Sequence, residues 1–451
     1  MELKDQSIGP VDSPKRYLQM ETSKYVYGVK KDDDLEEYSD DEFNGNQQDS
    51  ENGNGKSLDV NSDQLWYGSL WPESNFQKID VLKVALLIKN GYDVESNFLQ
   101  QEDHMKLPFE IILLILSFTE NPVSVNNLLI CRATYYLLLP ELYRSPYLHN
   151  KNFLTFVEMI GASSRKKKFG KLVKRLDLSG IVQMGKNSFL SRLLRRFSLS
   201  LEEFVAPQTS FGLSPLVSLR SCHSLKILDL RLVSETMNLK ELFLSIKNIP
   251  ELEQLSFPRS SISSEDYDMD WPQKLWYLRL SGGISNEFLL NSKFPSTITT
   301  LEFAHCPNIT GSSLVSVLMR IGMNLKSLSV VYPMPKLKED SLDFAFAYCP
   351  NLLNFYVNVE YVSRDLFHED LLPELEGQKR PLNCLTLDAC GLLGQSFKIH
   401  PDDITIAVAE NRLPCLKSVR ISHLVGWDFK SDDVDDLVSG LDDIGGSLFT
   451  I

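Results

Sequence analysis

The stretch Leu225-Lys226-Ile227-Leu228-Asp229-Leu230 contains three leucines, separated first by two residues and then by one. In an extended strand successive side chains point to opposite faces, so Leu228 and Leu230 share one face and Asp229 lies on the other. The stretch therefore predicts a short strand with a buried leucine face and an open polar face. Such a strand cannot bury its leucines alone, so it needs neighbours that carry the same pattern.

The same spacing of apolar residues recurs ten times from residue 173 to residue 421. Seven of the nine gaps between successive copies fall within the 20–29 residue period of leucine-rich repeats. The pattern predicts an α/β solenoid in which a parallel concave sheet is backed by helices or irregular returns. Helical returns are expected at residues 311–322, 340–349 and 402–411. The central apolar residues of the ten copies are Leu176, Phe204, Leu228, Leu255, Leu278, Leu301, Leu328, Phe355, Leu385 and Val419.

Residues between and beside the repeat leucines are predicted to lie exposed on the open face of this sheet. Charged and aromatic side chains in a row there are typical of a protein-binding surface. The alternative for each single residue is that it is only a solvated strand position. Asp177 and Asp388 are expected on the same face. The candidate substrate-binding residues are Asp229, Arg231, Tyr277, Arg279, Glu302, Tyr356, Asn358 and Arg420.

A helix is predicted to begin within Leu107-Pro108-Phe109-Glu110-Ile111-Ile112-Leu113-Leu114-Ile115-Leu116, ahead of the repeats. Pro108 suits a first helical turn, where its missing N–H would be unpaired anyway, and Glu110 complements the positive end of the helix dipole. One apolar stripe at helical spacing is formed by Ile111, Leu114, Ile115 and Phe118. Residues 105–150 are interpreted as three short helices. About 45 residues are too few for a self-sufficient core, so part of this apolar surface should face a partner or the next domain.

The remaining segments differ in composition. Residues 1–64 carry 16 acidic and 7 basic residues, nine of the fourteen net negative charges, and are predicted to be a disordered acidic tail. Residues 65–104 are predicted to be a helical segment that packs onto the body. The solenoid is expected over residues 151–431. Residues 432–451 are interpreted as an acidic capping segment with a helix at 432–443.

Composition and motifs exclude several classes of function. The acidic balance argues against nucleic-acid binding, and no run of about 18 apolar residues predicts a membrane span. Seven scattered cysteines and no apolar N-terminal leader favour the cytoplasm or nucleus. No phosphate-binding loop, nucleophile elbow or zinc-protease motif is present, so no catalytic residue, cofactor or metal is expected. The basic cluster Arg165-Lys166-Lys167-Lys168 is open to three interpretations: a nuclear-import signal, a phosphate-binding patch or a solvated linker.

Residues 107–148 resemble an F-box. The matching residues are Leu107-Pro108-x-Glu110-Ile111, Ile115-Leu116, Leu128-Leu129-x-Cys131-Arg132 and Leu139-Pro140-Glu141-Leu142-Tyr143. The repeats include Cys306-Pro307-Asn308-Ile309 and Cys349-Pro350-Asn351-Leu352, which look like cysteine-containing leucine-rich repeats. Over roughly residues 105–430 the chain therefore resembles an F-box/leucine-rich-repeat protein of fungal type.

The resemblance implies a non-catalytic substrate adaptor of a Skp1–cullin–F-box ubiquitin ligase. Such an F-box docks on Skp1, which links it to a cullin and a RING protein, while the repeats hold a protein substrate for ubiquitination and degradation. Two alternatives are a scaffold whose F-box-like helices only cap the solenoid, leaving no exposed stripe, and an enzyme with a deep pocket of convergent titratable groups. The implied Skp1 anchors are Leu107, Pro108, Ile111, Ile115, Leu116, Leu128, Cys131 and Leu142.

Overall fold

The computed structural model describes Ile111, Leu114, Ile115 and Phe118, and then residues 125–130, 132–161, 167–181, 187–262, 269–375, 377–391 and 398–451. Several sequence-based predictions lie outside these described residues. They are the disordered tail of residues 1–64, the helical segment of residues 65–104, residues 165 and 166 of the basic cluster, and the anchors Leu107, Pro108, Leu116 and Cys131.

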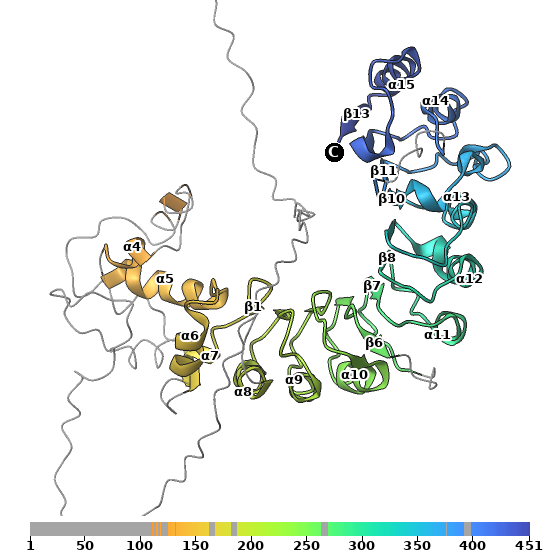
Figure 1. The fold of residues 1–451 in the computed structure, drawn as a ribbon. Helices are drawn as coiled ribbons and strands as arrows, with labels where there is room; N and C mark the ends of the chain where they lie inside the picture. Colours follow the sequence, from red (N-terminus) through yellow and green to blue (C-terminus); the bar gives the residue numbers. More distant parts are fainter. Residues whose placement is uncertain are drawn as a thin grey trace, which may run out of the picture. The chain divides into compact units, whose positions relative to one another are not determined.

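One long parallel sheet runs through the described residues, and its strands lie side by side in chain order. Strands β4 and β6 are not part of it and form a separate sheet. All ten central residues predicted from the repeat lie in strands of this sheet. Figure 1 shows the strands on the inner side of the curved array and the helices on its outer side. The strands are β1 (Arg175–Asp177), β2 (Glu203–Val205), β3 (Ile227–Asp229), β5 (Gln254–Ser256), β7 (Tyr277–Ser281), β8 (Thr300–Ala304), β9 (Ser327–Val331), β10 (Asn354–Asn358), β11 (Cys384–Asp388), β12 (Ser418–Ile421) and β13 (Ser447–Thr450).

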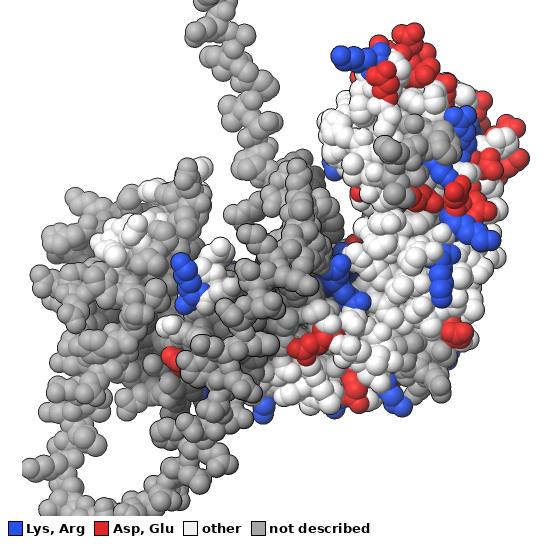
Figure 2. Space-filling model, viewed as in Figure 1, with Lys and Arg blue, Asp and Glu red and all other residues white. Residues whose placement is uncertain are grey.

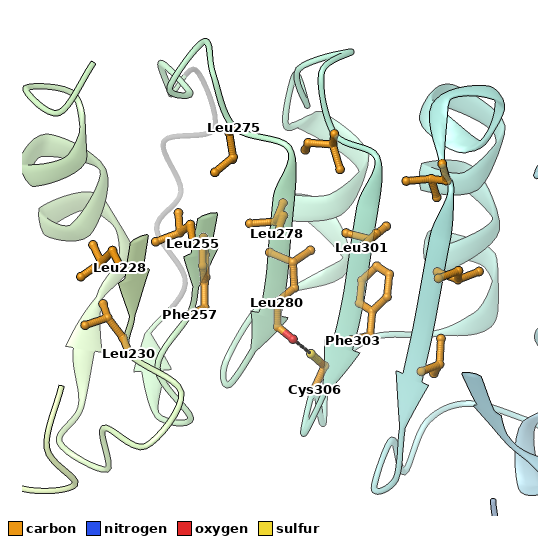
Figure 3. Packing of buried hydrophobic residues seen from close by; sticks show 14 of the residues in the cluster. Leu228, Leu230, Leu255, Phe257, Leu275, Leu278, Leu280, Leu301, Phe303 and Cys306 are labelled. Atoms are coloured by element: carbon orange, nitrogen blue, oxygen red, sulfur yellow. Dashed lines mark hydrogen bonds between the residues drawn. The ribbon is translucent and has the colours of Figure 1, made fainter. Parts of the chain in front are cut away.

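The register of the sheet stacks equivalent apolar residues in rows. Leu255 pairs with Leu278, and Leu278 pairs with Leu301. These leucines are fully buried, so each repeat completes the core of its neighbours. Figure 3 shows these rows from β3 to β8, with Cys306 Sγ donating to the carbonyl oxygen of Leu280 at 3.4 Å. Burial raises the pKa of the Cys306 thiol to about 12.

The returns between strands contain most of the predicted helices. They are α8 (Asn187–Phe197), α9 (Leu213–Leu219), α10 (Leu239–Ile246), α11 (Asn286–Asn291), α12 (Gly311–Ile321), α13 (Ala345–Tyr348), α14 (Pro401–Ala409) and α15 (Asp432–Asp443). Short 3-10 helices are η2 (Gly322–Asn324), η3 (Val359–Tyr361), η4 (Arg364–Phe367) and η5 (His423–Val425). A separate two-stranded sheet pairs β4 (Met237–Asn238) with β6 (Ser261–Ile262).

The helix predicted at residues 340–349 is shorter than expected, because α13 covers only four residues. The residues of its predicted first turn form hydrogen bonds with the next repeat instead. Leu342 donates its N–H to the carbonyl of Tyr361, and the Asp343 carboxylate accepts hydrogen bonds from the N–H and hydroxyl of Ser363. These bonds between repeats replace the helical bonds of that turn.

The C-terminal end of the array is closed by α15 and β13. Val434, Leu437 and Leu441 on α15 are buried against the last repeat, and the acidic first turn of this helix complements its dipole. Strand β13 was not predicted from the sequence. It pairs with β12 and places Leu448 beside Val419, so the sheet extends one strand beyond the ten repeats.

Candidate protein-docking surfaces

The helices before the sheet pack against the first repeats. They are α4 (Val125–Leu128), α5 (Arg132–Arg144), α6 (Phe153–Gly161) and α7 (Lys167–Gly170). The Tyr143 ring stacks on Phe169 at 4.9 Å between centroids, and Lys174 donates its N–H to the carbonyl of Arg144. The core cluster is continuous from α4 into the repeats. The end of the predicted F-box is therefore joined to the solenoid by shared packing.

Two of the predicted Skp1 anchors lie in this core rather than outward. Leu128 is only 2% exposed, and Leu142 is half-buried against the same core. A side chain that already contacts its own helices on most sides offers little surface to a partner. Of the two roles that the sequence left open, the packing of Leu128 and Leu142 supports the one that holds the helices together, and a docking role for either residue stays a prediction.

Four apolar side chains of the predicted first F-box helix are exposed. Ile111, Leu114, Ile115 and Phe118 are 40%, 52%, 53% and 83% exposed, and we call them the exposed stripe. Leu114 and Phe118 were placed on this stripe by helical spacing but were not among the predicted anchors. Grouped exposed apolar side chains mark interaction surfaces. Their exposure disagrees with helices that only cap the solenoid, since such helices would bury the stripe.

The open face of the sheet carries the predicted charged and aromatic residues, but three of them are buried. Asp229, Glu302 and Asn358 are 8%, 6% and 2% exposed, which corrects the expectation that they are exposed. These three side chains are buried because they form ion pairs or hydrogen bonds with residues nearby in the chain or on adjacent strands, which lie about 4.8 Å apart. Arg231 Nε lies 2.9 Å from Asp229 Oδ2, and Asn358 Oδ1 accepts a hydrogen bond from the backbone N–H of Tyr332 at 2.9 Å.

Glu302 is the centre of a polar cluster that joins β7 and β8. Arg279 lies directly beside it in the register, with Nη1 2.6 Å from Glu302 Oε1, and the Tyr277 hydroxyl donates to Oε2 at 2.8 Å. Burial, and then the negative charge of Glu302, raise the pKa of Tyr277 well above its usual range. Tyr277 is therefore a hydrogen-bond donor at physiological pH. The charged groups of the cluster are held in place by their hydrogen bonds and ion pair.

Farther along the face, Tyr356 and Asp388 form a second pair. The Tyr356 hydroxyl donates to Asp388 Oδ2 at 2.5 Å, and burial raises the pKa of Tyr356. Arg420 on β12 is exposed, and its Nε donates to the Ser418 hydroxyl at 3.4 Å. Substrate binding by any of these residues stays a prediction.

Replacing Glu302 with glutamine is expected to lower the free energy of unfolding by roughly 2 kcal/mol, because it leaves the Arg279 charge without its buried partner. The Arg279 side chain is only 15% exposed, so water cannot replace the lost carboxylate. Urea denaturation would measure the change. The control is Glu203→Gln, because Glu203 and its partner Arg175 are 38% and 44% exposed and should contribute less than about 0.5 kcal/mol. Equal effects of the two substitutions would contradict this role for Glu302.

A hollow of 590 Å³ lies among residues that precede β8, β9, β10 and β11, and Lys326 is the one titratable residue lining it. This hollow lacks the convergent titratable groups that an enzyme site requires. Among the described residues, no three His, Cys, Asp or Glu side chains are arranged to hold a metal ion. None of the helices in the described part of the chain is long and apolar enough to span a membrane.

Comparison with known proteins gives two relatives. The chain is 49% identical over 383 residues to F-box protein YDR306C of Saccharomyces cerevisiae, a match covering 80% of both chains. It is 34% identical over 320 residues to Protein pof5 of Schizosaccharomyces pombe, covering 71% of this chain and 90% of that protein. No protein-family model matches the sequence.

Two solved structures are more distant. The yeast Rad7 and Elc1 complex has a TM-score of 0.38 and 16% identity, covering 83% of this chain and 80% of that chain. The leucine-rich-repeat protein LegL7 of Legionella pneumophila has a TM-score of 0.36 and 13% identity, covering 68% of this chain and 94% of that chain. Both TM-scores are below 0.5, so the family assignment depends on the two relatives.

The parallel sheet repeats on a leucine period and is preceded by helices with an exposed apolar stripe, which defines a leucine-rich-repeat protein with an N-terminal helical module. Given its identity to an F-box protein over four-fifths of both chains, the chain belongs to the F-box/leucine-rich-repeat family. The resemblance seen in the sequence is thereby confirmed.

Proposed function

We propose that this protein is a non-catalytic substrate adaptor of a Skp1–cullin–F-box ubiquitin ligase. The observation that carries the proposal is the exposed stripe on the helical module of an F-box family member. The stripe and its neighbouring helices dock on Skp1, and the open face of the sheet binds a protein substrate. The compartment predicted from the sequence, cytoplasm or nucleus, is part of this proposal.

The chain would accelerate ubiquitin transfer by proximity. Skp1 connects the adaptor to a cullin and a RING protein, and binding of the substrate raises the local concentration of its lysines near the charged enzyme. No residue of this chain needs to form or break a bond. Substrate ubiquitination leads to degradation by the proteasome.

The stripe supplies part of the docking energy. Burying the exposed fractions of Ile111, Leu114, Ile115 and Phe118 would contribute roughly 5 kcal/mol. Association of two proteins costs about 4–15 kcal/mol in lost translational and rotational freedom, so the stripe alone does not account for stable docking. Leu107, Pro108, Leu116 and Cys131 remain predicted contributors to the same surface.

Capture of purified Skp1 by the full chain tests the proposal. Wild type should retain Skp1, and the double substitution Leu107→Ala/Pro108→Ala should weaken capture roughly tenfold or more, because it removes two predicted apolar anchors. Arg420→Ala, on the open face far along the sheet, is the control and should capture Skp1 like wild type. A wild-type chain that fails to capture Skp1 would contradict the proposed function.

A further inference from the structure

Within the described ranges of the chain, strand β13 is the last strand of the long parallel sheet, and no strand pairs with its outer side. Figure 1 shows it at the end of the inner row of strands, beside α15. Ser447 donates its N–H to the carbonyl of Lys417 at 2.9 Å, in the direction of β12. Because backbone groups alternate in direction along a strand, those of Leu448 and Thr450 point away from β12. Their N–H and C=O groups are therefore available to an added strand.

The edge lacks the features that commonly block strand addition. Soluble proteins protect such edges with lysine, proline or a bulge, or cover them. Residues 447–450 contain neither a charged residue nor a proline. Phe449 and Ile451, which alternation places on one face, are 49% and 53% exposed. Exposed apolar side chains beside unpaired backbone groups indicate a surface for a partner strand.

Helix α15 gives this end of the array a negative charge. Residues 428–443 contain seven aspartates and one basic residue, Lys430. Figure 2 shows Asp and Glu atoms gathered over this helix. Two contacts identify the side of α15 that faces α14. Asp433 Oδ2 lies 3.5 Å from His400 Nε2, and a Cβ on Gly440 would lie 3.9 Å from Thr405 Cγ2.

Asp435 and Asp442 lie on the opposite side of α15, because helical spacing places both about half a turn away from Asp433 and Gly440. They face away from α14, in the same direction as the open edge of β13. Both are exposed, and no basic side chain of the described residues forms an ion pair with either. The undescribed segment 392–397, which precedes α14, contains no charged residue. The flank of the open edge is therefore negatively charged.

We infer that the edge of β13 binds an extended segment of another protein in which basic and apolar residues alternate. The segment joins the sheet as a further strand through the backbone groups of Leu448 and Thr450. Its apolar side chains lie next to Phe449, and its basic side chains, on the other face, lie next to Asp435 and Asp442. A second copy of this chain is a poorer occupant, because pairing two such edges would bring two acidic helices together.

Fluorescence anisotropy of a short labelled peptide of alternating lysine and valine, titrated with the full chain, tests the inference. Saturable binding is expected. A peptide of alternating glutamate and valine should bind roughly tenfold more weakly, because it places like charges beside α15. A peptide of alternating lysine and proline keeps the charge but cannot donate the strand hydrogen bonds from its prolines, and should also bind roughly tenfold more weakly.

Variants of the chain locate the binding. Thr450→Pro removes an N–H that faces away from β12, so the sheet is retained. It should weaken binding of the lysine–valine peptide roughly tenfold, whereas Thr450→Ser keeps the N–H and should bind like wild type. Asp435→Asn/Asp442→Asn should weaken binding roughly fivefold. Its control is Asp340→Asn/Asp370→Asn, at two exposed aspartates between β9 and β11, which should bind like wild type.

The inference is overturned if the lysine–valine peptide does not bind, if the lysine–proline peptide binds equally well, or if Thr450→Pro binds like wild type. Self-association of the free chain that Thr450→Pro abolishes would also overturn it, because the edge would then be an interface between copies. The inference goes beyond the proposed function and does not depend on it. Skp1 is absent from the titration, so a failure here is distinguishable from a failure to capture Skp1.

Discussion

Replacing Leu114 and Ile115 together with glutamate is expected to weaken Skp1 binding at least a hundredfold. Both side chains are about half exposed in the free chain, so glutamates there remain solvated and the fold is retained. In the docked state the same positions would bury two charges without partners, at a cost of several kcal/mol. A loss of about 2.7 kcal/mol already corresponds to a hundredfold change in affinity.

Biolayer interferometry with immobilised Skp1 would measure this change. The matched control is Leu154→Glu, since Leu154 on α6 is 54% exposed but lies outside the exposed stripe. The control should bind like wild type, and both variants should unfold within about 2 °C of wild type. Undiminished binding by the Leu114→Glu/Ile115→Glu chain would show that the stripe is not the docking surface.

The substitution Phe303→Ala is expected to destabilise the array by about 3–5 kcal/mol. Phe303 is fully buried in the rows of Figure 3, where a truncated side chain leaves a cavity between adjacent repeats. Each repeat is stabilised chiefly by its neighbours, so a defect at β8 weakens the middle of the solenoid.

Urea denaturation followed by circular dichroism would measure the effect of Phe303→Ala. Phe344→Ala removes the same atoms from a side chain that is 44% exposed, and should cost about 1 kcal/mol or less. Similar losses from the two substitutions would mean that the stacked rows do not carry the stability of the array.

The repeat strands could be predicted because their pattern is local. Alternation along a strand and a regular leucine spacing place Leu278 and Leu301 in the core without knowledge of the partner strands. Strand β13 could not be found in this way, because its residues 447–450 lack the three spaced apolar residues and its pairing depends on β12.

The side-chain contacts on the open face of the sheet could not be predicted from the sequence. Alternation along the strands assigns Tyr277 and Glu302 to one face of the sheet. It does not predict the hydrogen bond between them, because the two residues are 25 positions apart in the chain. Similarly, helical spacing finds apolar residues such as Leu128 and Ile115 without saying which of them face a partner. That distinction depends on packing against later helices and repeats, which only the three-dimensional structure supplies.

The central claim is that one chain carries two separate surfaces, a helical one for Skp1 and a sheet face for substrate. Hydrogen–deuterium exchange of the full chain with and without Skp1 tests it most directly. The account predicts slower exchange in peptides covering residues 107–130 and unchanged exchange in the β5–β8 peptides. Protection of those strand peptides by Skp1, or unchanged exchange across residues 107–130 in a formed complex, would contradict it.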